Sequence, residues 1–143
     1  MSMKKSLSII AFLLFSSLSF AQDITQGTWY NEEKTGKIQF FKQGEKIFGK
    51  IVWLKEPNEN GKPRLDKENP DSKLKTRPLL GLINLKNFEN TGKGVWENGE
   101  VYDPKNGKTY SCKMTLASPT QLDVRGFIGI SLIGRTSKFT KAD

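Results

Sequence analysis

The chain has 143 residues and a formal net charge of +8, and it contains one cysteine and no histidine. The lack of histidine excludes Ser-His-Asp and Cys-His catalysis, the usual zinc ligand sets and histidine-ligated haem. The lone cysteine, Cys112, excludes an internal disulfide, and the alternation around it predicts a small buried apolar residue in place of a reactive thiol.

The first 21 residues have the features of a secretory signal peptide. A charged start at Lys4 and Lys5 precedes an apolar run, residues 7–15, that is too short to span a bilayer. Small residues end at Ala21, where we predict cleavage; the alternative is an uncleaved anchor. We therefore expect one domain, residues 22–143, in the periplasm or outside the cell, with a net charge of about +6, no membrane span and no nucleic-acid partner.

The apolar residues alternate with a period of two almost throughout the rest of the chain, which predicts strands. Predicted strands occupy residues 27–30, 37–41, 46–55, 82–88, 94–97, a short segment ending at 101–102, and residues 108–116, 121–128 and 135–141. Most are joined by tight turns, among them Asn60-Gly61, Asn90-Thr91-Gly92 and Asn98-Gly99. This order predicts an all-β fold, a single small antiparallel up-and-down barrel of about eight strands that closes to protect its edges.

Seven apolar side chains are predicted to face the barrel interior. They are Ile38, Phe40, Ile51, Trp53, Met114, Leu122 and Val124. A barrel of about eight strands is either filled by such side chains or holds one small ligand.

One long loop interrupts the short turns, from Asp66 to Gly81 (residues 66–81), and we expect it to act as a lid over one mouth of the barrel. Arg77 is predicted either to hold a ligand anion or to pair with Asp66 or Asp71 and fix the loop, whose Asn69-Pro70-Asp71 sequence favours a turn. The candidate ligand-binding or loop residues are Asp66, Asn69, Asp71, Arg77, Tyr102, Asp103 and Tyr110. Tyr102 and Tyr110 could equally pack across a hairpin.

No pattern demands catalysis or a metal. Glu68, Asp71 and Asp103 could form an acid–base pair, and Asp103 with Asn106 could bind calcium, but neither spacing matches such a site. We expect no enzyme activity, no metal and no cofactor.

Six stretches carry a resemblance to one family: G-T-W, F-G-K-I-V-W-L-K, N-P-D-S-K-L-K-T-R-P-L-L-G, G-E-V-Y-D-P-K-N-G-K-T-Y, L-D-V-R-G-F-I-G and G-R-T-S-K-F. Together they resemble the bacterial secreted family catalogued as domain of unknown function 2147. The resemblance implies a lipocalin-like barrel with no assigned activity. It also implies that Arg135 on the last strand stacks on Trp29 and closes one end of the barrel. The alternative is an ordinary core tryptophan and a surface arginine.

Two functions follow from these expectations. The first is non-enzymatic binding of a small, partly apolar ligand or envelope component inside the barrel. The second is a packed barrel that acts as a cell-envelope interaction module for a protein or polymer. An internal pocket distinguishes the two, and the sequence leaves the oligomeric state open.

Overall fold

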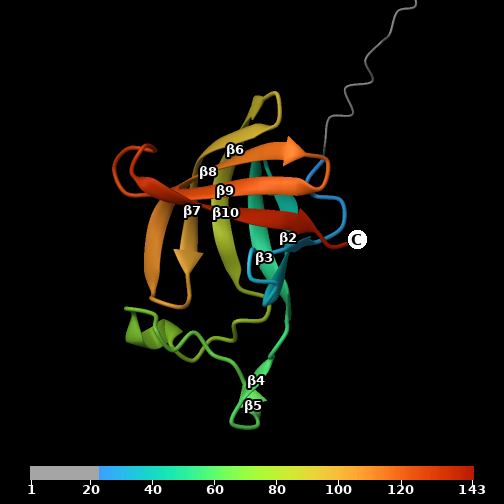
Figure 1. The fold of residues 1–143 in the computed structure, drawn as a ribbon. Helices are drawn as coiled ribbons and strands as arrows, with labels where there is room; N and C mark the ends of the chain where they lie inside the picture. The colour runs from blue at the N-terminus through green and yellow to red at the C-terminus, as the bar shows by residue number, and fades with distance from the viewer. Residues whose placement is uncertain (1–22) are drawn as a thin grey trace, which may run out of the picture.

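A computed structural model describes residues 23–143 (Figure 1). The predicted signal peptide, its cleavage after Ala21 and the start of the mature chain lie outside these residues. No helix in residues 23–143 has the length and apolar composition needed to cross a bilayer.

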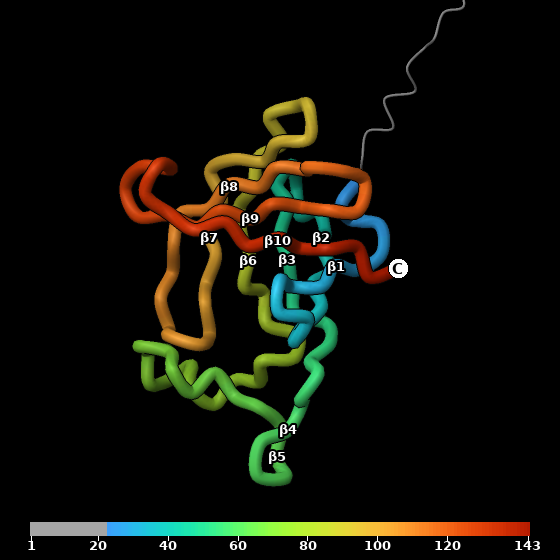
Figure 2. The backbone as a smooth tube through the Cα atoms, viewed as in Figure 1, coloured from blue at the N-terminus to red at the C-terminus, as the bar shows by residue number. Residues whose placement is uncertain are grey.

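Eight strands form a closed antiparallel barrel, which confirms the predicted fold (Figures 1 and 2). Strands that follow one another along the chain pair with each other around the barrel, and the first pairs with the last to close it. The barrel strands are β1 (Trp29–Tyr30), β2 (Gly36–Gln43), β3 (Lys46–Leu54), β6 (Ile83–Gly92), β7 (Val95–Asp103), β8 (Lys108–Ser118), β9 (Gln121–Phe127) and β10 (Gly134–Lys141).

The long connection between β3 and β6 contains a small ribbon of its own. Strands β4 (Asn58–Glu59) and β5 (Lys62–Pro63) pair across Asn60-Gly61. Both turn residues have positive φ, 52° and 74°, as a tight hairpin turn requires. The turn predicted at Asn60-Gly61 is therefore present. A 3₁₀ turn, η1 (Ser72–Leu74), follows it, and the whole connection lies below the barrel (Figure 1).

The turn predicted at Asn98-Gly99 is wrong. These residues lie inside β7, where the register with β8 shifts between Trp96 and Gly99 and Asn98 adopts a φ of 61°. A β-bulge accepts the same residues as a turn, because both need a residue that tolerates positive φ. The turn predicted at Asn90-Thr91-Gly92 is also misplaced: these residues end β6, and the hairpin between β6 and β7 turns at Lys93-Gly94.

The prediction that Trp53 faces the interior is also wrong, because a bulge reverses the alternation of β3. Ile38 pairs with Ile51, but the preceding residue Lys37 pairs with Trp53, so Val52 is an extra residue. Trp53 is therefore 37% exposed and lies beside Lys37, whose ammonium is 5.0 Å from the indole centroid. The other six predicted interior residues are buried.

The two ends of the barrel differ. One end is filled by large buried side chains, among them Trp29, Phe40, Ile47, Leu85, Phe88, Trp96, Met114 and Leu122. The chain before β1 closes this end, where the Trp29 indole N–H donates to the Ile24 carbonyl at 3.0 Å. The opposite end carries the β1–β2, β7–β8 and β9–β10 connections, and it remains open.

The predicted Arg135–Trp29 contact is wrong, because the two residues lie at opposite ends of the barrel. Trp29 pairs with Lys141 at the end of β10, and the Lys141 ammonium lies 4.8 Å from the indole centroid. Arg135 is six residues earlier on the same strand, which at about 3.3 Å per residue places it about 20 Å away. The Arg135 guanidinium instead contacts Glu32 at 3.4 Å.

Two glycines lie on either side of Cys112 in the sheet, and we expect an added methyl group to have different effects at the two positions. Gly99 and Gly126 both pair with Cys112. A Cβ at Gly99 would lie 2.4 Å from the Phe88 ring, so we expect Gly99→Ala to lower the free energy of unfolding by about 1–3 kcal/mol. The measurement is urea unfolding followed by tryptophan fluorescence.

Gly126→Ala is the matched control for this experiment. A Cβ there would meet its nearest atoms, Tyr110 Cβ and Val101 Cγ1, at an ordinary 3.6 Å, so stability should be unchanged or slightly higher. Equal stability of the two variants would contradict the packing described for Phe88.

Candidate functional site

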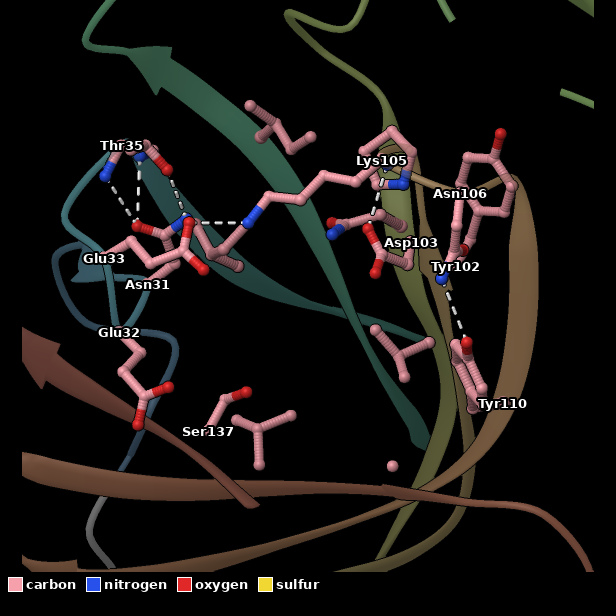
Figure 3. Close-up of a pocket in the computed structure, with 18 of the residues that line it drawn as sticks. Asn31, Glu32, Glu33, Thr35, Tyr102, Asp103, Lys105, Asn106, Tyr110 and Ser137 are labelled. Carbon is pink, nitrogen blue, oxygen red and sulfur yellow. Dashed lines mark hydrogen bonds and ion pairs between the residues drawn. The ribbon is translucent and has the colours of Figure 1, made fainter. Parts of the chain in front are cut away.

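The open end of the barrel leads into a cavity of about 1010 Å³. Its floor and walls are apolar and come from five strands: Ile38, Ile51, Val101, Val124 and Phe139. Its rim is polar and is formed by the β1–β2 loop and the β7–β8 turn, which face each other across the opening (Figure 3). An apolar chamber with polar groups around its mouth is the usual form of a small-molecule site.

One residue that lines the cavity, Asn84, has a buried side-chain atom without a hydrogen-bond partner in residues 23–143. The side-chain oxygen of Asn84, on β6, is buried and accepts no hydrogen bond from any residue that the structure describes. A buried acceptor without a donor costs about 1–3 kcal/mol, so this oxygen is a local cost to stability.

The rim charges are paired. Glu32 contacts Arg135 at 3.4 Å, Glu33 contacts Lys105 at 2.5 Å (Figure 3), and Glu56 contacts Arg64 at 3.2 Å. The hydrogen bond and the charge of Lys105 lower the pKa of the Glu33 carboxyl, so Glu33 is ionised at neutral pH. Each of these three acids thus has a basic neighbour, which keeps the net charge of the opening low.

Three of the predicted site residues line the cavity: Tyr102, Asp103 and Tyr110 (Figure 3). The Tyr110 hydroxyl accepts from the Asn106 side-chain amide at 3.0 Å. The Asp103 side chain accepts from the backbone N–H of Lys105 at 2.9 Å, so its role is to hold the β7–β8 turn.

Asp66 lies at the centre of a buried network outside the cavity. Its carboxylate is fully buried and accepts from the Tyr102 hydroxyl at 2.5 Å, the Asn69 amide at 2.9 Å and the Arg77 guanidinium at 2.8 Å. Three donors, one of them charged, compensate for the removal of this carboxylate from water. The network ties the long loop to the end of β7.

The pKa values of the network follow from these contacts. Burial disfavours ionisation of Asp66, but the hydrogen bonds from Tyr102, Asn69 and Arg77 outweigh it and hold the pKa of the carboxyl below 3.8. Burial, followed by the hydrogen bond to Asp66 and its negative charge, raises the pKa of Tyr102 to about 12. At neutral pH the pair is therefore a carboxylate and a neutral phenol.

The long loop borders the cavity and does not roof it. Of residues 66–81, only Leu79 lines the cavity, and Asp66, Asn69, Asp71 and Arg77 all lie away from it. The loop instead contacts the β7–β8 turn, where an added Cβ at Gly107 would lie 2.0 Å from the Glu68 carbonyl oxygen. Of the two roles predicted for Arg77, the structure shows the pairing with Asp66.

The predicted turn formers of the loop act as such. The Asn69 side chain accepts from the backbone N–H of Asp71 at 2.8 Å, which is an Asx turn, and Asp71 caps η1 by accepting from Lys73 N–H at 3.0 Å. Cys112 is buried, as predicted, and burial raises the pKa of its thiol to about 12. Within residues 23–143 no three histidine, cysteine or acidic side chains are placed to share a metal ion.

Sequence reasoning missed Asn84, the rim acids Glu32 and Glu33, and the apolar side chains between β9 and β10. Alternation gave no reason to single out Asn84, because only the closed barrel shows that this residue lines the cavity and that its side-chain oxygen is buried. The apolar run after β9 was visible in the sequence, and it marks residues that the core does not use.

Comparison with known proteins agrees with this architecture. The family described as "Uncharacterized protein conserved in bacteria (DUF2147)" matches residues 27–141. One solved structure, "Protein HP1028 from the human pathogen Helicobacter pylori belongs to the lipocalin family", has a TM-score of 0.74 and 21% sequence identity, over 85% of this chain and 84% of that one. At this identity the likeness concerns the fold. A search of curated proteins finds no match.

Removing the charge of Asp66 should destabilise the protein in a pH-dependent way. We expect Asp66→Asn to lower the free energy of unfolding at neutral pH by about 2–3 kcal/mol, because Arg77 and Tyr102 lose a charged acceptor. The folded pKa of Asp66 lies below 3.8, so its stabilisation is complete above that value and is lost as pH falls through the lower, folded pKa. Urea unfolding across this range should show the difference between the two proteins shrinking in acid.

Asp71→Asn provides the control, because Asp71 is exposed and asparagine can also accept the Lys73 N–H. Its effect should stay within about 0.5 kcal/mol. A pH-independent difference for Asp66→Asn would show that the ionised carboxylate does not hold the loop.

Proposed function

We propose that this chain, which belongs to the bacterial family DUF2147 and folds as a lipocalin-like barrel, binds a small, partly apolar molecule in the cavity at the open end of its barrel. The observation that carries the proposal is the cavity itself. At about 1010 Å³ it lies at the upper end of the volumes typical of ligand sites, and its walls are mainly aliphatic and aromatic.

The polar groups of the cavity define the ligand further. The polar side chains that line the cavity, Asn84, Tyr110 and Ser137 among them, favour a ligand with at least one group that can hydrogen-bond. The pairing of Glu32, Glu33 and Glu56 with basic side chains favours an uncharged ligand, because a charged group would have to break one of these pairs.

The proposed action is binding without catalysis, in the periplasm or outside the cell. The signal-like start of the sequence supports export, and the basic surface suits an anionic envelope. The alternative, a solidly packed interaction module, fits the filled end of the barrel but leaves the cavity without a role.

Native mass spectrometry of the protein purified from an exported preparation tests the proposal directly. A retained molecule adds mass under native conditions and is lost on denaturation. If the protein carries no added mass and gains none after incubation with envelope lipid extract, the proposal fails and the packed-module alternative is favoured.

Filling the cavity should abolish binding. Gly126 lines the cavity, its φ lies outside the left-handed region, and a Cβ there has room, so Gly126→Leu directs a side chain into the cavity without backbone strain. We expect its affinity for N-phenylnaphthylamine, an uncharged apolar fluorophore with a single N–H donor, to fall by at least about tenfold, or about 1.4 kcal/mol.

Thr109→Leu adds the same side chain at an exposed position on β8 and serves as the matched control. It should leave the affinity unchanged. Equal binding by the parent chain and Gly126→Leu, with both folded, would place the fluorophore outside the barrel.

A further inference from the structure

The connection between β9 and β10, residues 128–133, exposes large aliphatic side chains that the barrel core does not use. Ile128 is 72% exposed, Ile130 58%, Leu132 85% and Ile133 69%. The whole stretch from Gly126 to Gly134 contains no charged residue. Figure 1 shows this connection, in red-orange at the left, projecting beyond the barrel wall.

The backbone of this connection is already hydrogen-bonded internally. Ile133 N–H donates to the Ile130 carbonyl at 3.1 Å. The guanidinium of Arg125 donates to the carbonyls of Ser131 at 2.6 Å and Leu132 at 3.4 Å, and to the Thr136 hydroxyl at 2.9 Å. Three carbonyls of the segment therefore have hydrogen-bond partners within the protein, and its aliphatic side chains are exposed.

These features fit a lipid surface better than a protein. Backbone groups that enter hydrocarbon must find hydrogen-bond partners within the protein. The carbonyls of Ile130, Ser131 and Leu132 have such partners. A stable protein interface needs about 800 Å² from each partner, more than a six-residue projection offers, whereas interfacial binding needs only a few apolar side chains. The net charge of about +6 expected for residues 22–143 complements anionic headgroups, and Arg135, which follows the loop, is exposed beside its partner Glu32.

We propose that residues 128–133 insert into the headgroup region of an anionic phospholipid bilayer. Ile128 and Ile133 also line the cavity, so insertion brings the open end of the barrel to the lipid surface and gives a lipophilic ligand a route that avoids water. This last step rests on the proposed function, and the insertion itself does not.

The test measures co-sedimentation of the full mature protein with vesicles of phosphatidylcholine mixed with phosphatidylglycerol. The double variant Ile130→Ser/Leu132→Ser removes two exposed side chains that do not line the cavity. We expect it to lower the partition coefficient at least tenfold. The matched control, Leu74→Ser/Leu80→Ser, removes two exposed leucines from the long loop and should bind as the parent does.

Three outcomes would overturn the proposal. The parent protein fails to bind the vesicles, the double variant binds them as well as the parent, or the two double variants lose binding equally. Sedimentation velocity without lipid adds a fourth: self-association that Ile130→Ser/Leu132→Ser abolishes would assign the loop to a second copy of the chain. None of these outcomes changes the binding of N-phenylnaphthylamine, so this proposal and the cavity proposal fail separately.

Discussion

Closure of the sheet between its first and last strands is the constraint on which the rest of the structure depends. Strand β1 has only two residues, yet it pairs with both β2 and β10. Flanking contacts extend this short seam: Ala142 N–H donates to the Thr28 carbonyl at 2.9 Å, and Thr28 N–H donates to the Asp143 carboxylate at 2.8 Å. Because the seam joins Trp29 to Lys141, the end of β10 and the start of the domain meet at the filled end of the barrel.

The two ends of the barrel differ in role as well as in position. Trp29, Phe40, Phe88 and Met114 are each at most 2% exposed and supply the apolar burial that stabilises the fold. Towards the other end the inward positions of β9 become smaller, from Leu122 through Val124 to Gly126, and the interior opens into the cavity. A change at the filled end therefore affects stability first, and a change at the open end affects what the protein can hold.

The sequence predicted those features that depend on neighbours along the chain. Strand alternation, tight turns and the absence of helical periodicity led to the barrel, and the prediction of a buried Cys112 followed from the same pattern. The errors share one cause: they depend on pairing between distant residues. Trp53 points outward because Val52 is an extra residue opposite β2. Asn98-Gly99 forms a bulge because β7 continues to pair with β8 on both sides of it. Arg135 is far from Trp29 because Trp29 pairs with Lys141, at the other end of β10.

The same reasoning explains why the most polar stretch of the sequence is not the binding site. The long loop is rich in charged residues, but the Asp66 carboxylate already accepts hydrogen bonds from Tyr102, Asn69 and Arg77. A polar group whose partners are all within the protein stabilises structure and is not available to a ligand. Apolar groups differ in the same way: the core side chains are buried against one another, whereas those of residues 128–133 are exposed. The cavity and the exposed aliphatic side chains of residues 128–133 thus lie together at the open end of the barrel, and the buried core and the Asp66 network hold the rest of the fold.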